Sequence, residues 1–350
     1  MRIYDRILGP KEEPYVIAEI SGNHGGSLNR ALKIIDAAKW AGADAVKMQL
    51  FTPDSMTLDS NAPEFVIEKG IWKGRRLWEI YAETATPSEW FPKLLEHSRD
   101  LGLHFFSSVF DTWGLRFASD LGLPLVKVAS NELTHWPLLQ EVAESGLPAL
   151  VSTGGSSLTD ILLSMDFLGQ RARNWVLPLY CVSAYPAESQ VLNLAGLPYL
   201  AEKLATPLGF SDHTIGHQAA SLAVALGAVA VEKHIKLEDD QSSPDAFFSA
   251  PPNVFRDTVN AVKDAKVMVG VPKFGLTSSE ENAPILKRRY YAAKNLKAGS
   301  TIGADDLLAI RARYGLPTSK FLQVMGSRIV RDVAMHTPLV EGHLALGLPE

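Results

Sequence analysis

Short runs of β-branched and aromatic residues alternate, over the first 240 residues, with longer segments whose apolar residues recur at helical spacing. Eight such runs occur: YVIAEI (15–20), AVKMQLF (45–51), HFFSSVF (104–110), LVKVAS (125–130), PALVSTGG (148–155), WVLPLYCVSAYP (175–186), PLGFSDH (207–213) and VAVEKHIKL (229–237). Segments between them, such as SLNRALKIIDAAKWAGA, have Gly near their end, as helices do. Eight βα units in succession predict a (β/α)8 barrel, the TIM barrel. A doubly wound open sheet is the alternative, but it needs fewer strands and usually carries GxGxxG, which this sequence lacks.

The helical pattern stops after GVPKFGLTSSEENAP. The stretch KRRYYAAKNLKAGSTIGADDLLAIRARYGLPTSK reads as short strands and turns, with KAGS as a turn. We therefore expect a barrel over residues 1–275, a linker over 276–290 and a small second domain over 291–350.

Polar residues gather at the carboxyl ends of the predicted strands, where the catalytic residues of such barrels lie whatever the chemistry. The eight ends carry Glu19, Lys47 with Gln49, Ser107 with Ser108, Lys127 with Ser130, Ser152 with Thr153, Ser183 with Tyr185, Ser211 with His213, and Glu232 with His234. Several of these are i, i+2 pairs, whose side chains share one face of a strand. This polar face is predicted to point into the mouth of the barrel.

Two histidines, His213 and His234, end consecutive strands, which a closed barrel makes neighbours. A single strand histidine is more often a hydrogen-bonded core residue than a ligand. Two neutral imidazoles side by side, however, suit a divalent metal of the Mn, Co or Zn type, with oxygen ligands completing the shell. The pair therefore predicts a metal site.

An anion site is the second constellation. Positive charge and small hydroxyl donors come from Lys47, Lys127, Ser130, Ser152, Ser183 and Ser211. The segment STGGSSLTD adds two glycines and small donors at a helix start, where backbone N–H groups favour anions. A plain capped helix is the alternative for this segment, but together the groups fit phosphate.

The composition of the chain limits the kinds of partner that the protein is expected to bind. The chain is 46% hydrophobic with a net charge of -5 and has no basic runs, which predicts a small-molecule partner and neither nucleic acid nor membrane. Cys181 is the only cysteine, and the start MRIYDRILGPKEEPYV lacks the apolar core of a signal peptide. We expect a cytoplasmic protein.

The segments IAEISGNHGGS, GADAVKMQLFTPDSMTLDS, KVASNE, VSTGG, YCVSAYPA, GFSDHTIG and VEKH resemble, in order and spacing, the motifs of the sialic acid synthase family. The resemblance covers nearly the whole chain and implies that the small domain is antifreeze-like (SAF, a β-clip). The pattern W-x-x-R-x-L-x-x-x-Y, from Trp72 to Tyr81, is most similar to the branch that uses a 6-deoxy sugar with two acetamido groups. Branches that use other acetamido sugars are the alternative.

The resemblance implies condensation of phosphoenolpyruvate with an open-chain acetamido sugar, giving a nine-carbon 2-keto acid and phosphate. It implies a divalent metal (Mn, Mg or Co) on His213 and His234, supported by Glu232, and catalytic roles for Glu132 and Glu19. Phosphoenolpyruvate would contact Lys47, Ser108, Lys127, Ser130, Ser152, Ser183 and Ser211, and the sugar would contact Gln49, Tyr185, Asp245 and Arg311.

The resemblance also implies a domain-swapped homodimer, in which the small domain of the partner delivers Arg311. Arg311-Ala312-Arg313 replaces the usual Arg-Pro-Gly, so Arg313 competes for this role. Apolar contacts to a 6-deoxy sugar have candidates in Phe51, Met56, Phe65, Ile71, Trp72 and Trp78, each equally explained by packing beneath a long loop.

Two other classes of protein stay open. One is a metal-free aldolase with a Schiff base on Lys47, Lys127 or Lys233. The other is a non-catalytic carbohydrate- or ice-binding protein, which leaves the polar strand ends unexplained.

Overall fold

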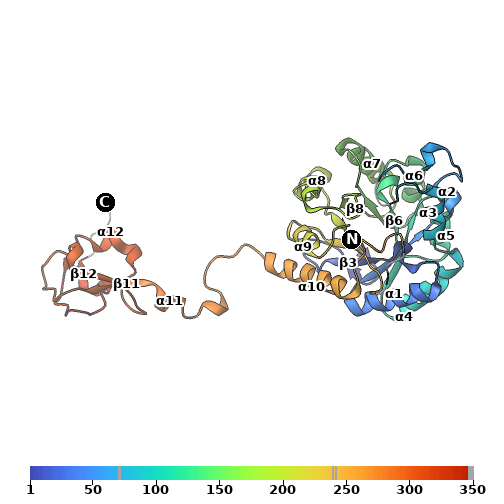
Figure 1. Cartoon of the computed structure of the whole chain (residues 1–350). Helices are drawn as coiled ribbons and strands as arrows, with labels where there is room; N and C mark the ends of the chain where they lie inside the picture. The colour runs from blue at the N-terminus through green and yellow to red at the C-terminus, as the bar shows by residue number, and fades with distance from the viewer. Residues whose placement is uncertain (70–71, 239, 241–242, 346–350) are drawn as a thin grey trace. The chain divides into compact units, whose positions relative to one another are not determined.

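The computed structural model describes residues 1–69, 72–238, 240 and 243–345. The chain forms two compact units, Met1–Gly270 and Val271–Glu350 (Figure 1). Each unit has its own hydrophobic core.

The first unit is a closed barrel of eight parallel strands, which confirms the predicted fold. Going round the barrel, β10 pairs with β3, and β3 to β9 follow in chain order. The strands are β3 (Tyr15–Glu19), β4 (Ala45–Leu50), β5 (His104–Val109), β6 (Val126–Val128), β7 (Ala149–Ser152), β8 (Val176–Cys181), β9 (Gly209–Asp212) and β10 (Ala230–His234). All eight lie within the runs predicted from the sequence.

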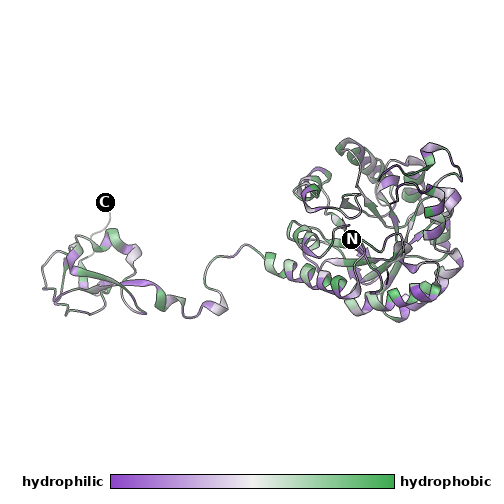
Figure 2. Cartoon of the chain, viewed as in Figure 1, coloured by the Kyte–Doolittle hydropathy of each residue, from purple (hydrophilic) through white to green (hydrophobic). Residues whose placement is uncertain are grey.

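Helices surround the barrel and carry both hydrophilic and hydrophobic stretches, as amphipathic helices do (Figure 2). They are α1 (Leu28–Ala41), α2 (Pro53–Met56), α3 (Leu77–Thr84), α4 (Phe91–Asp100), α5 (Thr112–Asp120), α6 (Trp136–Ser145), α7 (Leu158–Arg171), α8 (Gly196–Leu204), α9 (Gln218–Ala225) and α10 (Pro252–Val269). None of the helices that the structure describes is both long enough and apolar enough to cross a membrane.

The two-residue period of the strands separates two packed layers. On β4, Val46 and Met48 belong to the core shared with the helices, whereas Ala45 belongs to a second core inside the barrel. Further along the same inward face come Lys47 and Gln49, which line a pocket. The barrel interior is therefore apolar at the amino ends of the strands and polar at their carboxyl ends.

An amino-terminal hairpin closes the apolar end. It consists of β1 (Arg2–Ile3) and β2 (Arg6–Ile7), and its Ile3 packs with Leu8 and Tyr15 in the inner core. The sequence did not reveal it, because strands of two residues are too short to show a period.

A long insertion separates β4 from α4. It contains α2, a 3-10 turn at Pro63–Phe65, α3 and a second 3-10 turn at Ser88–Trp90, and a bridge between Val66 and Arg76 closes a loop within it. This insertion follows the carboxyl end of a strand and so lies on the face of the barrel where the polar strand ends emerge.

The second unit is small and mostly β. Strand β11 (Arg288–Ala292) pairs antiparallel with β12 (Leu307–Arg311), and β13 (Arg328–Ile329) with β14 (Leu344–Ala345). The short helices α11 (Ala283–Leu286) and α12 (Phe321–Val324) complete it. The KAGS segment forms a turn as predicted, with Gly299 at a φ of 89° and the Ser300 amide donating to Lys297.

Candidate active site

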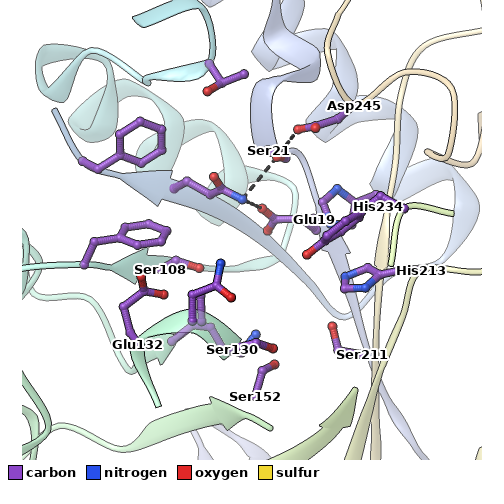
Figure 3. Close-up of a pocket in the computed structure, with 18 of the residues that line it drawn as sticks. Glu19, Ser21, Ser108, Ser130, Glu132, Ser152, Ser211, His213, His234 and Asp245 are labelled. Carbon is purple, nitrogen blue, oxygen red and sulfur yellow. Dashed lines mark hydrogen bonds between the residues drawn. The ribbon is translucent and has the colours of Figure 1, made fainter. Parts of the chain in front are cut away.

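The largest convergence of polar side chains lies in a pocket of about 240 Å³ at the carboxyl ends of the barrel strands (Figure 3). Most of the site residues predicted from the sequence line it: Glu19, Lys47, Gln49, Ser108, Lys127, Ser130, Glu132, Ser152, Tyr185, Ser211, His213, Glu232, His234 and Asp245. Every strand contributes at least one lining side chain: Glu19 from β3, Lys47 and Gln49 from β4, Ser108 from β5, Lys127 from β6, Ser152 from β7, Cys181 from β8, Ser211 from β9, and Glu232 and His234 from β10.

Two lysines and two carboxylates form the bottom of this pocket. Lys47 Nζ lies 2.8 Å from Glu19 Oε2 and 3.5 Å from Glu232 Oε1, and it donates to Ser108 Oγ at 2.8 Å. Lys127 Nζ donates to Glu232 Oε1 at 3.2 Å. The five side chains are buried. We call Glu19, Lys47, Ser108, Lys127, Ser152 and Glu232 the floor.

Burial and the neighbouring charges shift these groups in different directions. Burial raises the pKa of Glu19 and lowers that of Lys127. Burial alone would also raise the pKa of Glu232, but the ammonium groups of Lys127 and Lys47 hold it below its usual value. On the floor, Glu19 and Glu232 thus lie against the ammonium groups of Lys47 and Lys127.

Hydroxyl groups without partners lie beside these charges. Ser152 Oγ and Ser183 Oγ are buried and have no hydrogen-bond partner among the described residues. The Gly154 amide donates to Ser130 Oγ at 3.1 Å, and a Cβ at Gly154 would collide with Ser183 Oγ. Buried polar groups normally have partners, so the unpartnered hydroxyls suit an external acceptor such as a phosphate or carboxylate oxygen.

His213 and His234 lie side by side, with ring centroids 5.5 Å apart. His213 Nδ1 lies 2.9 Å from the Val182 carbonyl oxygen, so a proton on Nδ1 donates there and leaves the Nε2 lone pair free. His234 Nδ1 is buried without a partner among the described residues, and burial holds the pKa of His234 well below its usual value. A neutral imidazole with an unused nitrogen is the form that binds a metal.

In residues 1–69, 72–238, 240 and 243–345, no group of three or more His, Cys, Asp or Glu side chains is placed to hold a metal ion. The two imidazoles thus fit a metal whose remaining positions are filled by water or substrate. The metal stays a prediction.

Glu132 lies on the far side of the pocket from the two histidines (Figure 3). It follows β6 in a 3-10 turn, Ser130–Glu132, and its Oε2 is buried without a hydrogen-bond partner in the described part of the chain. Burial raises its pKa to about 7. A carboxyl group that titrates near neutral pH can both give and take a proton.

A hydrogen-bonded chain joins the floor to the loop after β10. Gln49 Nε2 donates to Glu19 Oε1 at 2.9 Å and to Ser21 Oγ at 3.2 Å, and Ser21 in turn donates to Asp245. The Gly22 amide also donates to Asp245, at 3.1 Å. These contacts fix two groups predicted to touch the sugar, Gln49 and Asp245, at the edge of the pocket.

Aromatic rings flank the histidines. The Tyr185 ring lies 4.4 Å from that of His213 and 5.0 Å from that of Phe248, which is itself 4.8 Å from His234. Trp72, from the insertion after β4, approaches Tyr185 at 6.4 Å. The rings exclude water from one side of the imidazoles.

Some predicted residues lie elsewhere or contact other groups. Glu232 contacts the two lysines rather than a histidine, because its place on β10 is two residues deeper in the barrel than His234. Ser183 lies beside Gly154 and is not a lining residue of the pocket. Arg311 ends β12 in the second unit, opposite Arg288.

Only some of the residues predicted to make apolar contacts with the sugar line the pocket. Phe51, Met56 and Trp72 line the pocket, but Phe65 and Trp78 do not, and Ile71 lies outside the described residues. Lys233, considered for a Schiff base, points away from the floor and is buried in an ion pair with Asp212 at 2.8 Å.

Sequence reasoning missed several lining residues: Ile67, Ile80, Thr84, Phe110, Asn131, Cys181 and Phe248. Ile67, Ile80 and Thr84 belong to the insertion and Phe248 to the loop after β10, where no period signals the direction of a side chain. Cys181 ends β8 and was detectable as a strand-end residue, but it was considered only for disulfides. Its Sγ lies 3.8 Å from His213 Nδ1.

A closed parallel barrel whose pocket, at the carboxyl ends of the strands, gathers buried lysines, carboxyl groups, hydroxyls and imidazoles defines this protein as a TIM-barrel enzyme. Residues 34–273 match the NeuB family and residues 287–345 match the SAF domain. The chain belongs to the NeuB family, which confirms the resemblance seen in the motifs.

Named relatives extend this match over nearly the whole chain. A pseudaminic acid synthase of Campylobacter jejuni is 34% identical over 93% of this chain and 95% of its own length. An N,N'-diacetyllegionaminic acid synthase of Legionella pneumophila is 31% identical over 94% of each chain. The crystal structure of an N-acetylneuraminic acid (sialic acid) synthetase from Leptospira borgpetersenii superposes with a TM-score of 0.72 at 27% identity, covering 81% of this chain and 94% of that one.

Proposed function

We propose that this chain is a pseudaminic acid synthase, which condenses phosphoenolpyruvate with 2,4-diacetamido-2,4,6-trideoxy-L-altrose to form a nine-carbon 2-keto acid and phosphate. The observation that carries the chemistry is the floor, where two buried lysines and the unpartnered Ser152 hydroxyl converge. The identity of 34% to a named pseudaminic acid synthase supports the choice of sugar.

The floor suits an anion with a phosphate at one end and a carboxylate at the other. Lys47 and Lys127 supply charge, while Ser152 Oγ supplies an unused donor. When the ligand arrives, its oxygens replace part of the Glu232 contact with the lysines. The buried charges then stay compensated, which a closed pocket requires.

Bond changes in the reaction define what the remaining residues must do. The C3 atom of phosphoenolpyruvate bonds to the aldehyde carbon of the sugar, and the aldehyde oxygen gains a proton. Water adds to C2 and loses one proton, which balances the proton gained by the aldehyde oxygen. The C2 hydroxyl then loses its proton as the keto group forms, the bond between C2 and the phosphate oxygen breaks, and the departing phosphate takes up that proton. Glu132, titrating near neutral pH, is placed to move a proton in these steps, and buried Glu19 is the second carboxyl within the floor.

His213 and His234 would hold a divalent metal such as Mn, Mg or Co. When bound, such a metal supplies a Lewis acid for the aldehyde oxygen. The unpartnered His234 Nδ1 and the free Nε2 of His213 support this assignment. Tyr185 and Phe248 orient both rings from the side.

The other classes of protein are less well supported. Lys233 is held by Asp212 and by the Thr214 carbonyl, so it is not free to attack a carbonyl carbon. A carbohydrate-binding protein without activity would have no use for buried, unpaired carboxyl and hydroxyl groups inside a barrel. A homodimer, with Arg311 acting in a partner pocket, and a cytoplasmic location remain proposals that rest on the family resemblance.

A sugar panel tests the proposed function. Purified protein with Mn²⁺ and phosphoenolpyruvate is given the diacetamido-trideoxy sugar, the sugar of a diacetyllegionaminic acid synthase, or N-acetylmannosamine. Phosphate release and product mass are then measured. We expect sugar-dependent phosphate release, fastest with the diacetamido-trideoxy sugar. Faster turnover of either other sugar reassigns the chain within its family, and no release with any sugar contradicts the proposal.

A further inference from the structure

The insertion between β4 and α4 forms one side of the pocket with apolar side chains. Met56, Ile67, Trp72 and Leu77 line the pocket and are neither fully buried nor fully exposed. We call these four residues the wall. Three of the residues in the pattern W-x-x-R-x-L-x-x-x-Y line the pocket, namely Trp72, Leu77 and Tyr81.

The charged groups of the insertion contact one another or Trp78 rather than the pocket. The contacts are Arg75 with Glu83, Arg76 with Asp59 and with Glu79, and Trp78 with Asp54. The Thr84 hydroxyl donates to the Ile80 carbonyl. Among the described residues of the insertion, no charged side chain lines the pocket. Through Met56, Ile67, Trp72 and Leu77 the insertion thus offers apolar surface to the cavity and keeps its charged groups outside it, which is how ligand pockets recognise an apolar group.

The order of elements along the chain decides which part of a ligand meets the wall. The floor and the histidines lie on or directly after the strands, where phosphoenolpyruvate and the reacting aldehyde must meet. The insertion begins after Phe51, beyond the end of β4, so the wall stands further from the floor. An open-chain sugar whose aldehyde lies at the histidines would direct its far end away from the floor and toward the wall.

We propose that the wall is a subsite for the far end of the sugar and selects a terminal methyl group over a hydroxymethyl group. This inference rests on the proposed function and adds the part of the chain that sets the specificity. The physical basis is asymmetric, because an added methyl group gains a little from apolar contact, whereas a hydroxyl group buried against the wall loses its water and gains no hydrogen-bond partner from Met56, Ile67 or Leu77.

The experiment uses two sugars that carry the same two acetamido groups. They differ only at C6, which is a methyl group in one sugar and a hydroxymethyl group in the other. The full chain with Mn²⁺ is assayed for kcat/KM with each sugar at saturating phosphoenolpyruvate. For the wild type we expect the methyl sugar to be preferred by about tenfold or more. Leu77→Gln adds a hydrogen-bonding group at the wall and should lower this preference to about threefold or less. Leu58→Gln is the matched control, because Leu58 belongs to the same insertion, is 64% exposed and does not line the pocket.

Four outcomes are informative. A preference that falls in Leu77→Gln and stays in Leu58→Gln supports the subsite. An unchanged preference in Leu77→Gln overturns it. If Leu77→Gln does not fold, Met56→Gln in the short helix α2 takes its place with the same two readings. Release of phosphate with neither sugar in the wild type rejects the proposed function instead, which keeps the two failures distinguishable.

Discussion

The floor and the wall of the pocket are built in opposite ways. The floor consists of side chains on paired strands, fully buried and locked by ion pairs such as Lys47 with Glu19 at 2.8 Å. The wall consists of apolar side chains on an insertion, partly exposed and held from behind by salt bridges that face away from the pocket. The difference indicates that the floor and the wall have separate functions. Rigid register places the reacting groups, and a separate segment, free to vary in sequence without disturbing the barrel, determines what is accepted.

The largest effect is expected at the histidines that adjoin the floor. His213→Ala or His234→Ala removes a nitrogen ligand and should lower turnover by about 10³-fold or more, with loss of bound metal. Turnover is measured by phosphate release, and bound Mn²⁺ is measured by elemental analysis after dialysis. His217→Ala is the control, since that side chain does not line the pocket. Full activity of the wild type in excess chelator would falsify the metal assignment.

A substitution of Glu132 should affect the chemical step and leave the binding of phosphoenolpyruvate nearly unchanged. Glu132→Gln keeps the shape of the side chain and removes its proton, so kcat should fall by about 10²–10⁴-fold while the KM for phosphoenolpyruvate changes little. Steady-state kinetics at saturating sugar measure both constants. A variant with normal kcat and a raised KM would assign Glu132 to substrate binding.

Glu132 should also make the stability of the folded protein depend on pH. Burial raises the pKa of Glu132 to about 7, above its unfolded value. Between these two values the folded state keeps a proton that the unfolded state loses, so this carboxyl contributes stability at low pH that is lost as the pH rises to about 7. Glu132→Gln does not titrate and should be more stable than the wild type by roughly 1 to 3 kcal/mol at pH 8, with little difference at pH 4.

Urea unfolding at the two pH values measures this difference. The argument requires the gap between variant and wild type to widen as the pH rises. An equal gap at pH 4 and pH 8 would mean that the Glu132 carboxyl does not titrate differently in the folded protein.

The smallest effect is expected for the stability of the wall. Leu77 is partly exposed at the start of α3, so Leu77→Gln should change the free energy of unfolding by less than about 1 kcal/mol. Unfolding in urea, compared with Leu58→Gln, measures it. A loss above about 3 kcal/mol would identify Leu77 as a core residue and would undermine the contrast between wall and floor.

The strand period made the floor predictable. Lys47 with Gln49 and Glu232 with His234 share a face, and the closed barrel turns that face inward, so chain order sufficed to bring them together. The ion pairs were not predictable, because they depend on how deep each residue sits in the barrel. Glu232 shows this, since it contacts the lysines instead of the histidines.

The wall was predictable only in part. Met56 and Trp72 were candidates that line the pocket, but Phe65 and Trp78 do not, because an irregular loop has no period to show which side chains turn inward. Trp78 donates to Asp54, a contact between residues far enough apart in sequence that no local pattern signals it. The amino-terminal hairpin was missed for a similar reason, since β1 and β2 have two residues each.

The division between floor and wall is tested most directly by comparing Ser152→Ala with Leu77→Gln on the same two sugars, one with a methyl and one with a hydroxymethyl group at C6. Ser152 Oγ is buried without a partner among the described residues, so its removal should not harm folding but should weaken phosphoenolpyruvate binding by about tenfold. With subsaturating phosphoenolpyruvate, we predict that Ser152→Ala lowers kcat/KM equally for both sugars and leaves their ratio unchanged, whereas Leu77→Gln changes the ratio. A ratio that shifts as much in Ser152→Ala as in Leu77→Gln would contradict the account.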